Sequence, residues 1–304
     1  MMRKPSASDF TLNPGDTIGV AAPAGPFDRE LFNKGRAVLE GMGFQVQADP
    51  RITERRGFLA GDDQQRVDVL HALFENDDIS AIVCARGGYG SLRLLPLLDD
   101  FLIRQNPKPF VGFSDITALL NVLALRCNTP VIHGPVVTSL SYAGAETLAG
   151  LERILSGEAI VISALDPSVI TPGRAAGPLF GGNLTTLNHL LATEFMPDLS
   201  GCILLLEDVN EAPYRIDRML CQMRMAGCFD TVAGIALGHF KNCGTPEEIR
   251  GVFVAHFETL RIPVLGGLPI GHGDVNIALP LGVPATIDTA NATLCVAGET
   301  TAPS

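Results

Sequence analysis

Apolar segments alternate with helical patterns along the first half of this 304-residue chain, and no other feature limits the possible folds as strongly. Residues 17–22, 79–85 and 131–133 are largely apolar, which is typical of strands buried on both faces of a sheet. Between them, residues 29–42 and 62–74 repeat apolar side chains at helical spacing. Because strands that alternate with helices build a parallel sheet covered by helices, we predict an α/β fold.

The pattern becomes less regular after Leu140, and the chain reads as two domains. A helix is predicted over 145–155. Residues 156–177 are rich in Ser, Pro, Gly and small side chains, which favours a crossing between domains. Further strands are predicted over 203–206 and 232–237, further helices over 184–193, 214–225 and 247–260, and short strands within 264–296. The predicted organisation is an N-terminal domain over 11–142, an interdomain linker over 143–177 and a C-terminal α/β domain over 178–301.

The composition argues against several kinds of partner. A formal net charge of −11 disfavours nucleic acid or an anionic membrane surface. No apolar run reaches the length of a membrane span, and the N-terminal residues MMRKPSASDF lack the apolar stretch of a secretory signal. The seven cysteines are odd in number and form no C-x-x-C pair, which favours reduced thiols in the cytoplasm and argues against a zinc cluster.

The stretch 109–120, PFVGFSDITALL, predicts a strand, a tight turn and a helix with Ser114 at the turn. A serine there is exposed beside a helix N-terminus, where amide donors can stabilise an oxyanion. Serine is also a common helix N-cap, however, and aspartate in the first helical turn is ordinary. The G-x-S-x-G elbow of hydrolases is incomplete, because Ile116 stands where its second glycine would be. Both interpretations of Ser114 therefore stay open on this evidence.

A glycine-rich loop, RGGYG at 86–90, directly follows the predicted strand 79–85. Its glycines allow the backbone to approach a ligand and to point amides at an anion. One hypothesis is a phosphate loop for a dinucleotide, but Arg93 stands where G-x-G-x-x-G requires a third glycine. A second is an oxyanion hole, since this loop and Ser114 would share the carboxyl edge of a parallel sheet. A plain tight turn is the third.

A nucleophilic serine needs a base, and three histidines follow apolar strands: His133, His239 and His272. His272 lies between two glycines, so its ring can stand free in a loop, and we rank it ahead of His239. Each could instead be a histidine that is hydrogen-bonded locally at a strand end.

A catalytic histidine in turn needs an acceptor that orients its ring. Glu207 follows the predicted strand 203–206 and is a candidate, with Asp208 and Glu211 as local alternatives. A solvated strand end is the ordinary interpretation of such a carboxylate. Metal chemistry has little support, because the chain contains no H-E-x-x-H motif and no histidine pair at helical spacing.

Taken in order, several motifs resemble the LD-carboxypeptidase family, serine peptidases of the S66 type. They are AAPAG at 21–25, RGGYG at 86–90, GFSD at 112–115, HGP at 133–135, GGNL at 181–184, LLEDVNEAPYRIDRML at 205–220 and GHGD at 271–274. The resemblance implies a Ser114–Glu207–His272 triad, with the backbone N–H groups of Gly88 and Asp115 as oxyanion donors. It also implies a flavodoxin-like N-terminal domain that contains the serine, a smaller C-terminal α/β domain, and a cytoplasmic homodimer.

The substrate that the resemblance implies is the murein tetrapeptide, cut between meso-diaminopimelate and the terminal D-alanine without a metal or cofactor. A related branch hydrolyses the peptide-nucleotide microcin C. The absence of tryptophan favours the murein activity, although Tyr or Phe could stack on a nucleotide base. Arg86 and Tyr89 are candidate substrate contacts, with Arg215 or Arg218 as alternatives for the terminal carboxylate. A non-catalytic binding module and a nucleotide-linked dehydrogenase are the rival classes.

Overall fold

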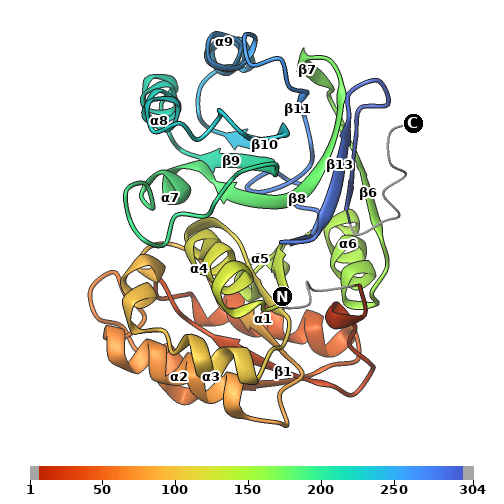
Figure 1. The fold of residues 1–304 in the computed structure, drawn as a ribbon. Coiled ribbons are helices and arrows are strands. Elements are labelled where there is room, and N and C mark those ends of the chain that lie inside the picture. Colours follow the sequence, from red (N-terminus) through yellow and green to blue (C-terminus); the bar gives the residue numbers. More distant parts are fainter. Residues whose placement is uncertain (1–6, 297–304) are drawn as a thin grey trace.

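The computed structural model describes residues 7–296, which form two lobes, each built on its own sheet (Figure 1). The first sheet has the strand order β12-β5-β4-β3-β1-β2, and all its neighbouring strands are parallel except β12 and β5. Its strands are β1 (Thr17–Ala21), β2 (Gln45–Ala48), β3 (Ala81–Cys84), β4 (Phe110–Gly112), β5 (Val131–His133) and β12 (Leu279–Leu281). The order β2-β1-β3-β4-β5 is that of flavodoxin, so the predicted fold class is confirmed.

Helices cover this first sheet and begin close to where the sequence predicts them. Asp62 caps one of them, since its Oδ1 accepts a hydrogen bond from the Gln65 amide at 2.8 Å. The helices of the lobe are α1 (Arg29–Gly41), α2 (Asp63–Glu75), α3 (Asp100–Gln105), α4 (Thr117–Val122) and α5 (Val137–Leu140). Short 3₁₀ turns are η1 (Ala7–Phe10), η2 (Pro50–Thr53), η3 (Ser91–Leu97) and η4 (Ser114–Ile116), and η5 (Leu123–Cys127) is a π-turn.

The second sheet is mixed and has eight strands in the order β6-β14-β13-β8-β9-β10-β11-β7. Its central strands β8 to β11 are parallel, and the strands outside them are antiparallel to their neighbours. The strands are β6 (Ile160–Ser163), β7 (Ser168–Thr171), β8 (Arg174–Asn183), β9 (Ile203–Val209), β10 (Gly234–Lys241), β11 (Val264–Gly266), β13 (Pro284–Asp288) and β14 (Thr293–Val296). The helices of this half are α6 (Ala145–Leu155), α7 (Leu184–Asn188), α8 (Pro213–Met225) and α9 (Pro246–Phe257).

The segment 143–177, expected as an interdomain linker, contains regular structure instead of a simple crossing. It holds α6, β6, β7 and the start of β8, and all three strands belong to the second sheet. Ile160 and Ile162 of β6 are buried while Val161 is exposed, an alternation too short to stand out among Ser, Pro and Gly. Residues 297–301 of the expected C-terminal domain lie outside the described residues, so the exact boundaries stay predictions.

Three connections hold the lobes together. The buried Asn121 of α4 exchanges two hydrogen bonds with Gly181 of β8, at 3.0 and 3.1 Å. Thr117 Oγ1 accepts a bond from the Asn183 amide at 3.0 Å. The strand β12 leaves the second half of the chain and pairs with β5 of the first sheet. Because buried polar groups must be paired, these bonds fix one lobe against the other.

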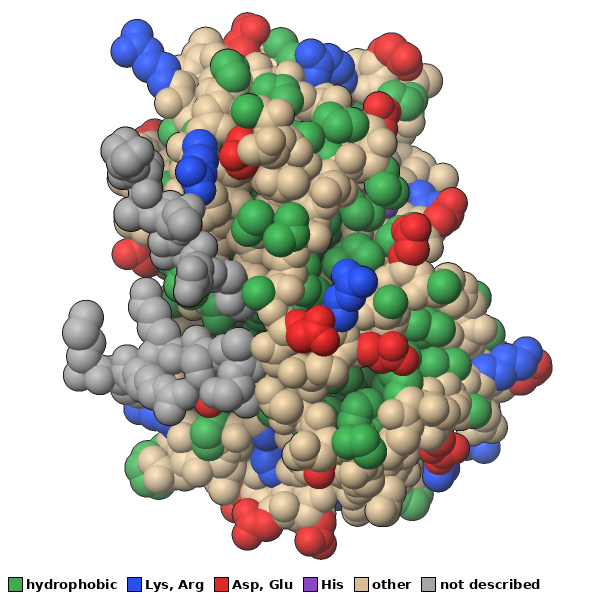
Figure 2. All heavy atoms as spheres, turned by 90° about the vertical axis from the view of Figure 1, so that its right-hand side faces the viewer, with side chains coloured by type: hydrophobic (Ala, Val, Ile, Leu, Met, Phe, Trp, Pro, Cys, Tyr) green, Lys and Arg blue, Asp and Glu red, His purple; other side chains and the backbone are tan. Residues whose placement is uncertain are grey.

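The described surface is consistent with the acidic composition. Figure 2 shows acidic and basic side chains scattered over one face, without a broad basic area. No helix among the described residues is long and apolar enough to cross a membrane. All seven cysteines are free thiols.

Candidate active site

Ser114 occupies a strained backbone turn directly after β4. Its φ is +64°, in the left-handed region that residues other than glycine rarely adopt. The chain then enters η4 and α4, so a buried strand turns into a helix at the serine. Gly112 is required here, because a Cβ at this position would lie 2.6 Å from Cγ2 of Ile116. The turn therefore has the strand–turn–helix geometry of the hydrolase elbow, with Ile116 in place of the second glycine.

The glycine loop packs directly against this elbow, as expected for neighbouring strands of one parallel sheet. A Cβ at Gly87 would lie 2.9 Å from Cβ and 3.2 Å from Oγ of Ser114. The carboxylate of Asp115 accepts a hydrogen bond from the Ser91 amide at 2.8 Å, which ties the elbow to the far end of the loop. Gly88 has a φ of +107°, and its amide donates to no acceptor within residues 7–296. The loop thus places a free donor beside the serine.

His272 and Glu207 form a buried acid–base pair. Nδ1 of His272 lies 2.6 Å from Oε2 of Glu207, and the His272 backbone N–H donates to the same oxygen at 3.2 Å. The histidine belongs to the loop between β11 and β12. Gly271 has a φ of +93°, and a Cβ there would collide with the Glu207 carboxylate. Glycine at 271 therefore lets the loop close over the acid.

The two pKa values shift in the directions that an acid–base pair requires. Burial raises the pKa of Glu207, but the His272 and His133 rings outweigh burial, and the net pKa is lowered to about 2. Burial lowers the pKa of His272, but the Glu207 carboxylate outweighs it, and the net pKa is raised above 6.5. Glu207 is therefore ionised at neutral pH, and it makes the His272 ring a stronger base.

The residue before the serine packs against this pair, and the serine is not bonded to it. The rings of Phe113, the residue before Ser114, and His272 have centroids 4.8 Å apart. Within the described residues, Ser114 Oγ donates no hydrogen bond to the His272 ring. Such bonds are often long in enzymes without substrate and tighten only in the complex. The structure thus brings the three predicted residues to one seam between the lobes, with the acid–base pair formed.

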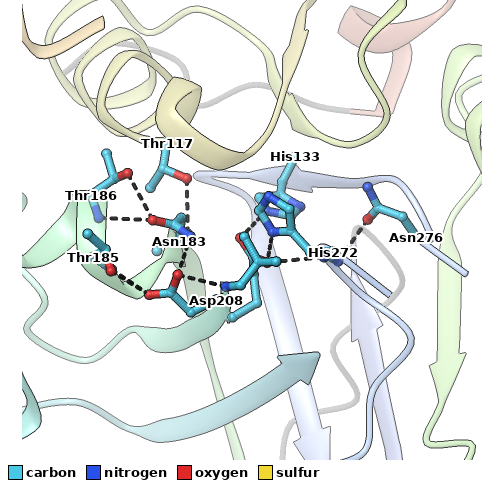
Figure 3. A network of polar contacts seen from close by, with 12 residues as sticks. Thr117, His133, Asn183, Thr185, Thr186, Asp208, His272 and Asn276 are labelled. Carbon is cyan, nitrogen blue, oxygen red and sulfur yellow. Dashed lines mark hydrogen bonds and ion pairs between the residues drawn. The ribbon is translucent and has the colours of Figure 1, made fainter. Parts of the chain in front are cut away.

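The alternative acids have other partners. Asp208 accepts hydrogen bonds from Asn183 Nδ2 at 3.0 Å and from the backbone N–H of Thr185 at 2.9 Å, so it holds the start of α7 (Figure 3). Glu211 contacts Arg215 at 3.4 Å. Glu207 itself does not end its strand as expected, because β9 continues to Val209 and buries it completely.

The two other candidate bases, His239 and His133, are both held by packing. His239 is half-buried, and its ring packs so closely on Gly273 that a Cβ there would collide with it. His133 is fully buried in β5, with Nε2 3.9 Å from Oε1 of Glu207. Neither that oxygen nor either His133 ring nitrogen has a hydrogen-bond partner among the described residues. His133 is therefore a buried neighbour of the acid and has no exposed ring.

Two cavities flank the seam. The serine cavity, of about 490 Å³, has walls that include Gly88, Tyr89, Ser114, Asp115, His189 and Glu211. The histidine cavity, of about 390 Å³, has walls that include Phe113, Tyr142, Lys241, His272, Asp274 and Asn276. His189, Tyr142 and Lys241 were not singled out as site residues from the sequence. The signal available for Lys241 was its place four residues after the predicted strand 232–237; the structure extends that strand to Lys241.

The predicted substrate contacts are distributed unevenly around these cavities. Tyr89 lines the serine cavity, where its ring meets Phe58 edge-on at 5.3 Å. Arg86 is exposed, donates to the Pro26 carbonyl at 2.6 Å and belongs to the walls of neither cavity. Arg215 and Arg218 both lie over the Tyr214 ring on α8, at 5.9 and 5.3 Å from its centroid. Of these four residues, only Tyr89 lines either of the two cavities.

Comparisons with known proteins identify relatives of this chain over both lobes. Models of the LD-carboxypeptidase N-terminal and C-terminal domains match residues 18–134 and 176–287. The chain is 36% identical to a probable murein peptide carboxypeptidase of Bacillus subtilis, covering 94% of this chain and 92% of that protein. It is 34% identical to the murein tetrapeptide carboxypeptidase of Pseudomonas aeruginosa, with 95% and 98% covered. An MccF-like protein from Bacillus anthracis superposes with a TM-score of 0.88 at 27% identity over 97% and 99% of the chains. The chain belongs to the LD-carboxypeptidase family.

Proposed function

We propose that this protein is a serine LD-carboxypeptidase that releases the terminal D-alanine of murein tetrapeptide through an acyl-enzyme. The observation that supports this most is the buried Glu207–His272 pair, 2.6 Å apart, beside the strained turn of Ser114. An alcohol, an imidazole and a carboxylate with these surroundings are the parts of a serine-peptidase triad. The names of the relatives supply the substrate class.

In the proposed first step, His272 takes the proton of Ser114 as Oγ attacks the carbonyl of the L,D amide bond. Glu207 fixes the ring through Nδ1 and stabilises the imidazolium that forms. The backbone N–H groups of Gly88 and Asp115 bind the developing oxyanion. Loss of one such donor costs roughly 3 kcal/mol of barrier in comparable sites.

In the second step, the imidazolium gives its proton to the departing amine of D-alanine, and the acyl group remains on Ser114. Water then replaces the amine, gives its proton to the same ring and attacks the ester. The ester bond to Ser114 Oγ then breaks, and His272 returns its proton to that oxygen. The proposed chemistry therefore needs only groups of this chain and water.

Hydrolysis of a peptide-nucleotide is the second candidate, and Tyr142 favours it specifically. This side chain is 74% exposed and lines the histidine cavity, where a nucleotide base could stack on its ring. The MccF-like neighbour fits the same idea. The higher sequence identity to murein carboxypeptidases favours the first candidate.

We also propose that the protein acts in the cytoplasm as a homodimer. Seven free thiols suit a reducing compartment, and four of them are buried. The dimer rests on the family resemblance alone. Light scattering of the purified protein, measured over a range of concentrations, tests the dimer directly.

The decisive experiment incubates the protein with murein tetrapeptide and follows the loss of one D-alanine by mass spectrometry. Ser114→Ala is the matched inactive control, and an aminoacyl sulfamoyl adenosine analogue tests nucleotide-peptide recognition by titration calorimetry. Release of D-alanine by the native protein alone supports the proposal. Absence of release, together with tight binding of the analogue, would replace it with the second candidate.

A further inference from the structure

If the proposed function holds, each of the two cavities would take a different part of the substrate. The proposed oxyanion donors Gly88 and Asp115 line the serine cavity, so the scissile carbonyl oxygen would point there. His272 lines the other cavity and must protonate the departing amine. The bonds from the tetrahedral carbon to the amine and to the oxyanion point in different directions. The departing residue therefore extends into the histidine cavity.

A residue that ends in a free carboxylate needs a cation near its end. Among the described residues, Lys241 is the only lysine or arginine in the walls of the histidine cavity. It ends β10, the central strand that pairs with the strand of Glu207. Arg86, the candidate from the sequence, lies outside both cavities and already donates to the Pro26 carbonyl.

The ammonium of Lys241 can accept such a ligand without losing its present partner. Nζ lies 2.7 Å from Oδ1 of Asp274, whose side chain is 95% exposed. An ammonium has three donor hydrogens, and an exposed carboxylate is well solvated, so Asp274 occupies only part of the cation. The Lys241 side chain is itself 44% exposed, which leaves it accessible from the cavity.

Buried hydrogen bonds hold the His272 loop against another wall of the histidine cavity. Asn276 Oδ1 accepts a hydrogen bond from the Gly271 amide at 2.8 Å. The Asn276 amide donates to Thr147 Oγ1 of α6 at 3.0 Å. Both side chains are nearly fully buried, so His272 and the cavity floor keep a fixed relation. A cation at the end of a central strand can then bind a carboxylate that lies one residue beyond the scissile bond.

We propose that Lys241 binds the C-terminal carboxylate of the substrate in the histidine cavity and thereby restricts cleavage to the last residue. A peptide blocked at its C-terminus offers no carboxylate to the ammonium. Lys241 is thus a specificity-determining residue, and the departing D-alanine is its ligand.

The test compares Lys241→Met with the native protein on two peptides, murein tetrapeptide and its C-terminal carboxamide. We expect KM for the free acid to rise at least tenfold, while kcat for the acid and both constants for the amide change less than twofold. Lys241→Arg should restore most of the acid preference. Equal losses on acid and amide would overturn the proposal, as would an unchanged KM for the acid.

Two controls are matched to the variant. Lys34→Met removes another surface lysine that pairs with a carboxylate, Glu30 at 2.6 Å, and should leave both substrates unaffected. Arg86→Leu tests the rival cation, and selective loss of the acid substrate in that variant would assign the carboxylate to Arg86 instead.

A binding measurement separates this proposal from the proposed function. Calorimetry with Ser114→Ala and Ser114→Ala/Lys241→Met measures affinity for the acid and the amide without turnover. Acid-selective weakening by the lysine change would support the subsite even if the native protein released no D-alanine. If neither variant distinguishes acid from amide, the subsite is refuted even for an active enzyme.

Discussion

The two lobes contribute to the site by different physical means. The first lobe is a regular parallel sheet, and it presents Ser114 through local backbone geometry, a φ of +64° between a strand and a helix. The second lobe is a mixed sheet, and it supplies Glu207 and His272 through burial and a close hydrogen bond. The geometry of the candidate nucleophile is therefore a property of one turn, whereas the His272–Glu207 pair depends on packing among distant segments.

Replacement of Ser114 tests the local half of this comparison and has the largest expected effect. Both Ser114→Ala and Ser114→Gly should lower kcat about 10⁶-fold, because the nucleophile is gone. Ser114→Gly should be the more stable of the two by about 1 kcal/mol, since glycine adopts a positive φ without strain. Chemical denaturation of both variants measures this difference. Equal stabilities would mean that the elbow holds no strain.

Glu207→Gln tests the packed half. The expected loss in kcat/KM is about 10⁴-fold, as for other triads whose acid becomes an amide. In the native protein the base must be neutral, so activity falls as the pH drops through the raised pKa of His272. Without the Glu207 carboxylate, burial becomes the largest influence on the pKa of that ring, ahead of the raising effect of Asp208 and the lowering effect of Lys241. The acid limb should therefore move to lower pH. A kcat/KM profile against pH measures the shift, and an unmoved limb would contradict the pairing.

Gly87→Ala tests the contact between the glycine loop and the elbow. The added Cβ would lie 2.9 Å from Cβ of Ser114, so the loop must move away from the serine. We expect a loss of roughly 100-fold in kcat, the size of a misplaced oxyanion donor. Gly41→Ala is the control, because a Cβ at the end of α1 would meet no atom within 4 Å. Similar kinetics for the two variants would remove the loop from the mechanism.

His133→Phe tests how the first lobe supports the acid of the second and should have the smallest effect. The pKa of Glu207 is lowered from its usual value of 4.5 to about 2, so the ionised carboxylate stabilises the folded state at pH values above 4.5. This contribution to stability is lost as the pH falls toward 2. Removal of the His133 ring should raise that pKa and reduce the contribution, by an amount on the order of 1 kcal/mol. Unfolding measured at pH 7 and pH 3 detects the change. Identical pH dependence in both proteins would show that His133 does not act on Glu207.

The local elements could be predicted well because their causes are local. The strand–turn–helix at Ser114 follows from apolar periodicity and a tight turn, and the parallel pairing of the first sheet follows from alternating strands and helices. Segment 143–177 was harder, since β6 and β7 are four residues each and find partners only in the distant β14 and β11. Such short strands are defined by pairing across the sheet and leave a weak local pattern.

The sequence by itself determined the residue types of the triad, the glycines that permit its turns and the α/β class. Only the tertiary structure decided that Glu207 is fully buried inside β9 rather than solvated at a strand end. It also shows the contact between His272 and Glu207, which the family resemblance had implied as partners, and it places Lys241 in one cavity with His272. The physical reason is that turns and periodicity act between neighbours along the chain. Burial, charge pairing and cavities arise where segments far apart in sequence pack together.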